Sequence, residues 1–212
     1  MVPLPNLLTF ALASVALIVL PGPTVLFVIG RSLALGRLGG LLSVLGNALG
    51  LVPVIAAVAL GLGAIVTGSV VVFTVIKFAG AAYIVYLGVQ AIRHRHAAAQ
   101  TLGLSIVPKT KWRLLAEGSV VGISNPKSIV FFVAVLPQFV DYSAGAVPLQ
   151  LLTLGLVFVV LALLGDSVWA LAAGSARDWF AKSPRRMEHL SASGGVMMIG
   201  LGGVLAATGA QS

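Results

Sequence analysis

Residues 147–173 read VPLQLLTLGLVFVVLALLGDSVWALAA and contain a single charged side chain, Asp166. A helix needs about 20 apolar residues to cross the roughly 30 Å of bilayer hydrocarbon. The chain of 212 residues is 59% hydrophobic and only 8% charged, which excludes a soluble domain. We therefore expect a single all-α integral membrane domain, 1–212. Six segments are long enough to span the membrane, near 6–30, 40–64, 70–91, 117–139, 147–173 and 190–208.

Lysine and arginine residues fall in alternate gaps between these segments. Eleven of the thirteen lie in three gaps, at residues 31–37, 93–113 and 177–186. Short cytoplasmic loops retain Lys and Arg, so these gaps should face the cytoplasm and both chain ends, the N- and C-termini, should lie outside. The net charge of +8 then indicates contact with anionic lipid headgroups of the bilayer rather than with nucleic acid.

A long cytoplasmic loop, about 92–116, separates two halves of three spans each, about 6–91 and 117–208. Because each half has an odd number of spans, the halves must enter the membrane in opposite directions. Inverted repeats of this kind are common in secondary transporters. Each half also opens with a helix that proline interrupts, so we expect helices 1 and 4 to be broken.

Glycine is frequent, with 25 residues, and several are spaced as Gly46-x3-Gly50 and Gly118-x3-Gly122. Small residues at this spacing let transmembrane helices approach closely. The spacing favours tight packing within one bundle, and the alternative is the interface of a homodimer.

Two sequences should interrupt transmembrane helices. Pro21-Gly22-Pro23 lies in the first span, where proline removes a helix N–H and glycine permits unusual backbone angles. Thr24 follows, and its hydroxyl can bond a freed carbonyl or a ligand. Asn125-Pro126-Lys127 lies in the fourth span, and asparagine before proline is a turn signal. Freed backbone groups inside a bilayer must face protein or a wet cavity.

Counting residues from the cytoplasmic end of each span places several polar groups at one depth, roughly 10–15 Å in. Asn47, Asn125, Lys127 and Asp166 share this layer with the first break, which predicts a small polar site for substrate binding or coupling. Buried ionisable residues are costly and mark function by default. We expect a Lys127–Asp166 ion pair. The alternatives are a pair that only braces two helices and a lysine that snorkels to the interface.

The two breaks should present opposite poles to this layer. The first ends a half-helix and leaves carbonyls at its negative dipole end, whereas the second restarts a helix at its positive end. Such a pocket suits a zwitterion, with the ammonium of an amino acid beside the first half-helix and Asp166, and its carboxylate beside the second half-helix and Lys127. Asp166 could also carry a proton. Lys77, near the outer end of the third span, either snorkels outward or lies on the exit path.

With these residues in view, the chain resembles the LysE/RhtB family of amino-acid exporters over nearly its whole length. The matching motifs are Pro21-Gly22-Pro23 with Thr24, Gly46-Asn47-Ala48-Leu49-Gly50, Lys77 to Tyr83, Tyr86-Leu87-Gly88, Gly118 and Gly122, Asn125-Pro126-Lys127, Phe131-Phe132, Pro137-Gln138-Phe139, and the late span with Asp166. The resemblance implies a six-helix bacterial inner-membrane protein that exports amino acids or similar small metabolites by antiport, driven by the proton gradient. It does not fix the substrate.

Other functional classes fit less well. An intramembrane enzyme would need a nucleophile with a base or a metal cluster, but the chain has no cysteine and neither a His-Glu-x-x-His nor a Gly-x-Ser-x-Gly motif. We therefore expect no enzymatic activity, no cofactor and no metal site. A passive pore would show rings of one charge sign. An exporter of ions or other small solutes, or a membrane protein without transport activity, remain the alternatives.

Overall fold

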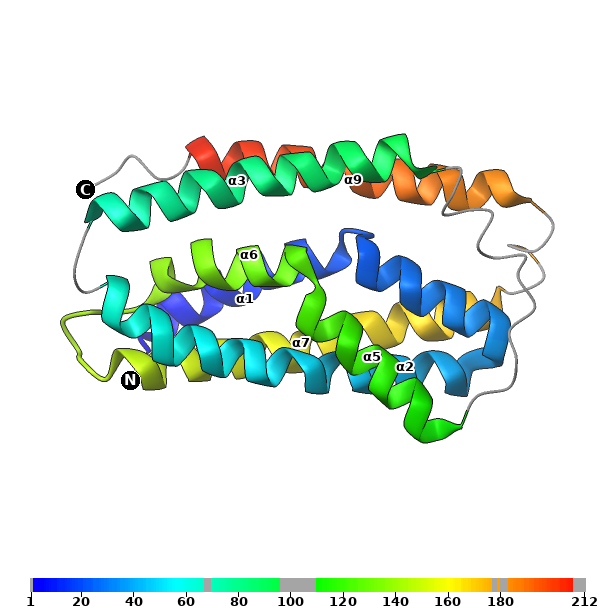
Figure 1. Ribbon diagram of the computed structural model, residues 1–212, viewed down its shortest axis with the longest axis horizontal. Helices are drawn as coiled ribbons and strands as arrows, with labels where there is room; N and C mark the ends of the chain where they lie inside the picture. The colour runs from blue at the N-terminus through cyan, green and yellow to red at the C-terminus, as the bar shows by residue number, and fades with distance from the viewer. Residues whose placement is uncertain (1, 67–69, 96–109, 177–178, 180–182, 208–212) are drawn as a thin grey trace.

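The structure is a computed structural model that describes residues 2–66, 70–95, 110–176, 179 and 183–207. Within these ranges every regular element is helical, as the predicted all-α class requires. The elements, shown in Figure 1, are α1 (Leu4–Val19), α2 (Pro23–Val66), α3 (Val70–Arg93), α5 (Lys111–Ser124), α6 (Pro126–Ala134), the short 3-10 helix η2 (Leu136–Phe139), α7 (Val147–Ser175) and α9 (Pro184–Ala207).

Both predicted helix breaks are present. Helix α1 ends at Val19, Leu20 is extended (φ −66°, ψ 116°), and α2 begins at Pro23. Asn125 is also extended (φ −68°, ψ 105°) and separates α5 from α6. The two parts of this second broken helix are bent by 45°. Proline is tolerated at the start of a helix because the first N–H groups have no partner there, which explains why a helix restarts at each break.

Helix α2 contains a chain reversal that the sequence did not predict. Gly36 has φ 76° and ψ −178°, a conformation that glycine adopts readily, and it divides α2 into a first arm (23–35) and a second arm (37–66). Figure 1 shows α2 running to one end of the bundle and returning. The predicted gap between the first two spans is therefore helical on both sides of one reversing residue, and this corrects the expected loop.

Each predicted span overlaps one or more of these helices. By length and composition, Pro23–Gly61, which includes the reversal at Gly36, and Val147–Ser175 are sufficient to cross a membrane, and α5 with α6 and η2 can count as one bent span. The remaining apolar helices are shorter: Leu4–Val19, Phe78–Arg93 and Ser191–Val204. The first of these is short because the break divides its span, since α1 and the first arm of α2 lie on either side of residues 20–22.

The helices form two layers. In Figure 1, α3 and α9 lie side by side and cover the remaining helices, with α6 beneath them. The contact between α3 and α9 is close at two glycines. A Cβ added to Gly88 would lie 2.5 Å from the carbonyl oxygen of Gly195, and a Cβ on Gly195 would lie 2.5 Å from that of Gly88.

The glycine spacing noted in the sequence packs α2 against α5 within one chain. A Cβ on Gly50 would lie 2.2 Å from the carbonyl oxygen of Ser119, and one on Gly122 would lie 2.3 Å from that of Asn47. Gly46 and Gly118 meet the partner backbone in the same way. Packing within one bundle, the interpretation that the sequence favoured, is thus confirmed, and the homodimer stays a prediction.

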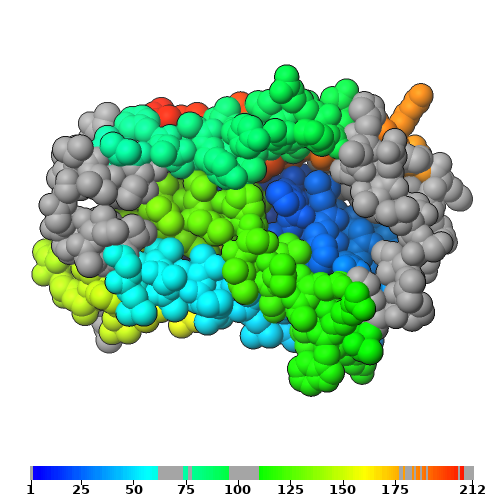
Figure 2. Space-filling model, viewed as in Figure 1, coloured from blue at the N-terminus to red at the C-terminus, as the bar shows by residue number. Residues whose placement is uncertain are grey.

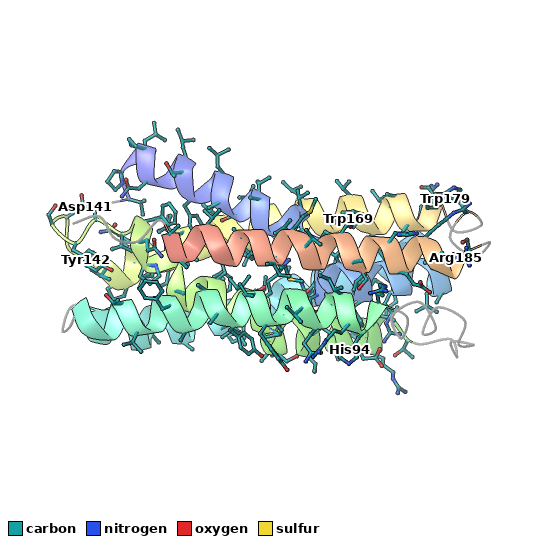
Figure 3. All side chains as sticks on the ribbon, turned by 90° about the horizontal axis from the view of Figure 1, so that it is seen from above. His94, Asp141, Tyr142, Trp169, Trp179 and Arg185 are labelled. Carbon is teal, nitrogen blue, oxygen red and sulfur yellow. The ribbon has the colours of Figure 1, made fainter. Side chains whose placement is uncertain are left out.

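The two ends of the bundle differ in composition. Helix α1 begins and α9 ends at the same end in Figure 1. Asp141 and Tyr142 lie at that end in Figure 3, whereas Arg185 and Trp179 lie at the opposite end. This arrangement agrees with the alternation of basic gaps along the chain.

Candidate functional site

The two breaks meet at a small buried cavity of about 20 Å³. A cavity of this size holds about one water molecule, so it is closed to an amino acid in this conformation. Five of the nine residues predicted for the site line this cavity. The polar lining residues are Thr24, Asn47, Asn125, Lys127, Ser128 and Asp166, and the apolar ones are Leu17, Ile18, Val25, Leu51, Phe158 and Ala162.

Lys127 reaches from the second break to the end of α1. The last carbonyls of a helix have no partner within it and form its negative dipole end. The Lys127 ammonium donates to two such oxygens, those of Leu17 and Leu20, each at 3.0 Å. Gly22 leaves room for the lysine, because a Cβ there would lie 3.1 Å from Nζ. The side chain is only 5% exposed, so these contacts lie inside the bundle.

Asn125 joins the second break to the first. Its side-chain oxygen accepts from the backbone N–H of Lys127 at 3.1 Å and caps the start of α6. Its side-chain nitrogen donates to the hydroxyl of Thr24 at 2.6 Å and to that of Ser128 at 3.0 Å. Both hydroxyl oxygens act as acceptors here, so their hydrogens are free to donate to a further group.

Asp166 and Asn47 form the acidic side of the cavity. The Asn47 side-chain nitrogen donates to the Asp166 carboxylate at 3.3 Å. The Asn47 side-chain oxygen is buried and has no hydrogen-bond partner within the part of the chain that the structure describes. A buried acceptor without a partner is rare and needs an explanation such as a bound water, ion or ligand.

The predicted Lys127–Asp166 ion pair is wrong as a direct contact. Both side chains line the cavity, but the ion pairs formed by the described residues do not include one between them. The Lys127 ammonium instead binds the carbonyls of Leu17 and Leu20, while Asp166 is hydrogen-bonded by Asn47. The freed carbonyls of the first half-helix, which we expected to receive a substrate ammonium, are therefore occupied by Lys127.

The other predicted residues shape the breaks or lie elsewhere. Pro23 and Pro126 are the first residues of α2 and α6. The carbonyl of Pro21 faces α9, where a Cβ on Gly194 would lie 2.0 Å from its oxygen. Lys77 belongs to α3, but its side chain is outside the described part of the structure. Its place on an exit path stays a prediction.

Sequence reasoning missed seven residues of the cavity wall, among them Phe158, Ala162 and Ser128. Phe158 and Ala162 precede Asp166 by eight and four residues, so all three lie on one face of α7. This helical spacing was a signal that could have found them. Ser128 directly follows Lys127, and its hydroxyl is recognisable only once the Asn125 contact is known.

Phenylalanine rings pack beside the cavity. The Phe158 ring lies 4.8 Å from Phe132 and 5.3 Å from Phe131, and Phe131 lies 5.8 Å from Phe10, all between ring centroids. Because Phe158 also lines the cavity, this cluster seals its side with apolar surface.

An ionic contact joins the same two broken helices elsewhere. Arg31, on the first arm of α2, pairs with Glu117 of α5. Arg113 also donates to Glu117, at 3.1 Å. Arg31 and Arg113 belong to gaps predicted to face the cytoplasm, so this contact ties the first arm of α2 to α5 near the basic end.

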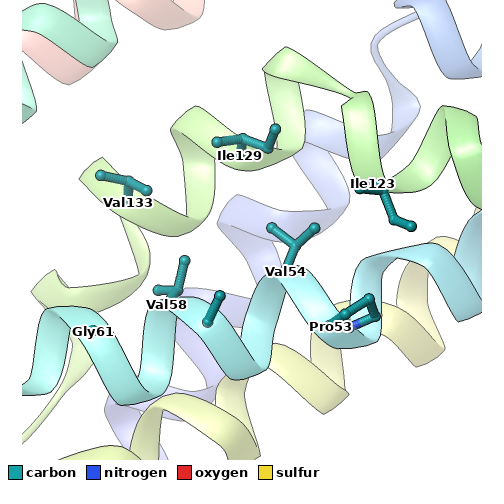
Figure 4. Close-up of a pocket in the computed structure, with 8 residues that line it drawn as sticks. Pro53, Val54, Val58, Gly61, Ile123, Ile129 and Val133 are labelled. Carbon is teal, nitrogen blue, oxygen red and sulfur yellow. The ribbon is translucent and has the colours of Figure 1, made fainter.

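A larger groove of about 510 Å³ lies on the far side of α6. It runs between the second arm of α2 and the helices α5 and α6, as Figure 4 shows. In Figure 2 the surface of α6 is recessed between α3 and α2. Its lining is apolar and includes none of the predicted site residues, so the small polar cavity is the candidate site. The lining residues are Pro53, Val54, Ala57, Val58, Gly61, Ile123, Ile129 and Val133.

A protein-family model described as LysE type translocator matches residues 15–209. The chain belongs to this family. Membership confirms the resemblance seen in the sequence motifs, and a family of translocators is consistent with the expectation that the chain is not an enzyme.

Several relatives align over nearly their whole length. An uncharacterized membrane protein of Vibrio cholerae is 36% identical over 200 residues, which cover 94% of this chain and 95% of the relative. A homoserine/homoserine lactone efflux protein of Salmonella typhimurium is 32% identical over 197 residues, covering 93% and 94%. A membrane protein of Bacillus subtilis is 28% identical over 204 residues, covering 93% and 96%. No solved structure matches this LysE type translocator.

Proposed function

We propose that this protein is a secondary active exporter that moves amino acids or closely related small metabolites out of the bacterial cytoplasm in exchange for protons. The observation that carries the proposal is the buried polar cavity between two interrupted helices, which holds a lysine and an aspartate. Family membership and a relative named for efflux of homoserine and homoserine lactone support export as the direction of transport.

The proposal includes six spans in two inverted repeats, with both chain ends outside and the basic gaps in the cytoplasm of the inner membrane. Helix packing supports the repeat, because elements at equivalent places in the two halves lie together. The second arm of α2 packs on α7, α3 packs on α9, and the two breaks touch through Asn125 and Thr24. Such pairing is expected when two halves are related by a two-fold axis in the membrane plane.

In the proposed cycle, the cavity opens toward the cytoplasm to admit substrate. The Asp166 carboxylate and the free side-chain oxygen of Asn47 accept hydrogen bonds from the substrate ammonium. The hydroxyls of Thr24 and Ser128 donate to its carbonyl or carboxylate oxygen. After release on the outside, Asp166 takes up a proton and returns it to the cytoplasm. Because one carboxylate serves both ligands in turn, proton entry drives substrate exit.

Flux measurements on purified protein test the proposal. Proteoliposomes loaded with radiolabelled homoserine should lose it faster than protein-free vesicles, and faster still when the receiving side is made acidic. A panel of neutral, basic and acidic amino acids with homoserine lactone then defines the substrate class. Equal leakage from both kinds of vesicle for the whole panel would refute amino-acid export and leave other solutes as the alternative. Flux that does not change with the pH gradient would refute proton coupling but not amino-acid export.

A further inference from the structure

We propose that Lys127 is a positioning residue whose ammonium occupies a cation site formed by the carbonyls of Leu17 and Leu20, and that this contact holds the two helix breaks together in the closed conformation. In this role Lys127 does not bind the carboxylate of the substrate. The inference rests on the proposed export function, since it concerns the opening of the same cavity.

Most of the hydrogen-bond donors of the Lys127 ammonium are used by carbonyls at the end of α1. An ammonium has three N–H donors, and two of them are used at 3.0 Å by the oxygens of Leu17 and Leu20. These oxygens lie at the negative end of the α1 dipole, which favours a cation. The site therefore recognises a primary ammonium through geometry as well as charge, and the protein supplies that ammonium from its own chain.

Burial explains why the ammonium stays there. A buried charge is costly unless it is paired or well hydrogen-bonded. Lys127 is 5% exposed and makes no direct ion pair with Asp166, so the two carbonyls supply its direct hydrogen bonds, and the attraction of Asp166 across the cavity adds to them. The lysine stem also lies against Gly22, whose added Cβ would be 3.3 Å from Cδ and Cε. Gly22 thus provides the space through which the side chain reaches α1.

The same contacts cross the seam between the two helix breaks, and this seam must open to admit substrate. Lys127 and Asn125 lie at the start of α6, and their partners Leu17, Leu20 and Thr24 lie on the two sides of the first break. The cavity beside this seam is too small for an amino acid, so admission of substrate requires the breaks to separate. Releasing Lys127 from the carbonyls is then part of opening, while Asp166 and Asn47 remain available to the substrate.

Chemical rescue tests this assignment. Lys127→Ala removes the three carbons beyond Cβ and the ammonium, which together correspond to propylammonium. We expect the variant to export labelled homoserine about tenfold more slowly than wild type, because the transport cycle also passes through the closed conformation, which two charge-assisted hydrogen bonds no longer stabilise. Millimolar propylammonium in the vesicles should restore a measurable part of that loss. 1-Propanol lacks the charge and tetramethylammonium lacks N–H donors, so neither should restore transport.

A thiol-labelling assay measures closure of the cavity independently of transport. The chain has no cysteine, so Ala162→Cys introduces a single thiol into the cavity wall. Its reaction with a charged methanethiosulfonate reagent should accelerate about tenfold when Lys127→Ala is added, and propylammonium should reverse the change. Gly22→Ala keeps every charge but crowds the ammonium, and it should also accelerate labelling. This second variant maintains the test if Lys127→Ala cannot be purified.

Substrate binding separates the two roles of the lysine. If Lys127 is a positioning residue, labelled homoserine should bind the Lys127→Ala protein within a few fold of wild type although transport is slow. Binding lost in parallel with transport, unchanged thiol labelling and no rescue by propylammonium would overturn the inference and assign Lys127 to the substrate. Because labelling needs no substrate, failure of the export proposal would be seen separately, in the wild-type flux.

Discussion

Asp166→Asn is expected to slow homoserine export by a factor on the order of one hundred while leaving the protein folded. Asparagine has nearly the same shape and can still interact with Asn47, but it carries neither a negative charge nor a transferable proton. In the proposed cycle Asp166 pairs with the substrate ammonium, and removing one partner of such a buried, hydrogen-bonded charge pair costs about 2–5 kcal/mol, where each 1.4 kcal/mol is about tenfold in an equilibrium constant. Initial rates of efflux from proteoliposomes measure the effect.

Asp141 offers a matched control for this substitution. It lies in the loop between η2 and α7, and its carboxylate accepts from the Ser143 hydroxyl at 2.6 Å. That hydrogen bond, the largest cause, lowers the pKa of Asp141 below its ordinary value, so this carboxylate is ionised at neutral pH. Asp141→Asn should transport like wild type. Equal losses in both variants would show that any lost carboxylate impairs the protein. Normal export by Asp166→Asn would remove this residue from the mechanism.

Counting residues along the sequence grouped the polar residues of the candidate site into one layer. Proline beside glycine or asparagine determines where a helix can be interrupted, because the steric reasons are local. Charge alternation sets the direction of each span, and counting residues then gives depth. Thr24, Asn47, Asn125, Lys127 and Asp166 consequently line one cavity in the structure, as the shared depth had suggested.

Hydrogen-bond partners within that layer could not be predicted in the same way. Depth gives no information on how a helix is rotated about its axis or which neighbour it meets. The expected Lys127–Asp166 contact was therefore wrong, although both groups line the same cavity. The free carbonyls at the end of α1 were predicted, but only the packing of α6 beside α1 shows that Lys127 reaches them.

The sequence also could not predict which helices lie side by side. The pairing of α3 with α9 depends on glycines that are far apart in the chain and follow no shared motif, such as Gly88 and Gly195. The reversal at Gly36 was hidden for a different reason. Arg31 and Arg37 indicated a cytoplasmic gap, which is commonly a loop, whereas one glycine with φ 76° is enough to turn the chain.

The second substitution with a large expected effect lies at the contact between α9 and the first break. Gly194 packs directly against Pro21, and a Cβ there would lie 2.0 Å from the Pro21 carbonyl oxygen and 2.9 Å from its carbonyl carbon. Backbone atoms cannot rotate away as a flexible side chain can. We expect Gly194→Ala to destabilise the protein by about 3 kcal/mol, at the upper end of typical overpacking, and to impair export by displacing the break. Thermal unfolding of the purified protein in detergent measures the first effect, and proteoliposome efflux measures the second.

Gly200 in the same helix provides the control, because an added Cβ there meets no atom within 4 Å. Alanine is a better helix former than glycine by roughly 0.5–1 kcal/mol, so Gly200→Ala should leave stability unchanged or raise it slightly. The two substitutions add the same methyl group to one helix, and only the first adds it against the break. If both variants unfold and transport like wild type, α9 does not pack on Pro21 as described. If only Gly194→Ala fails, and its export falls even at temperatures where it remains folded, the position of the first break itself limits transport.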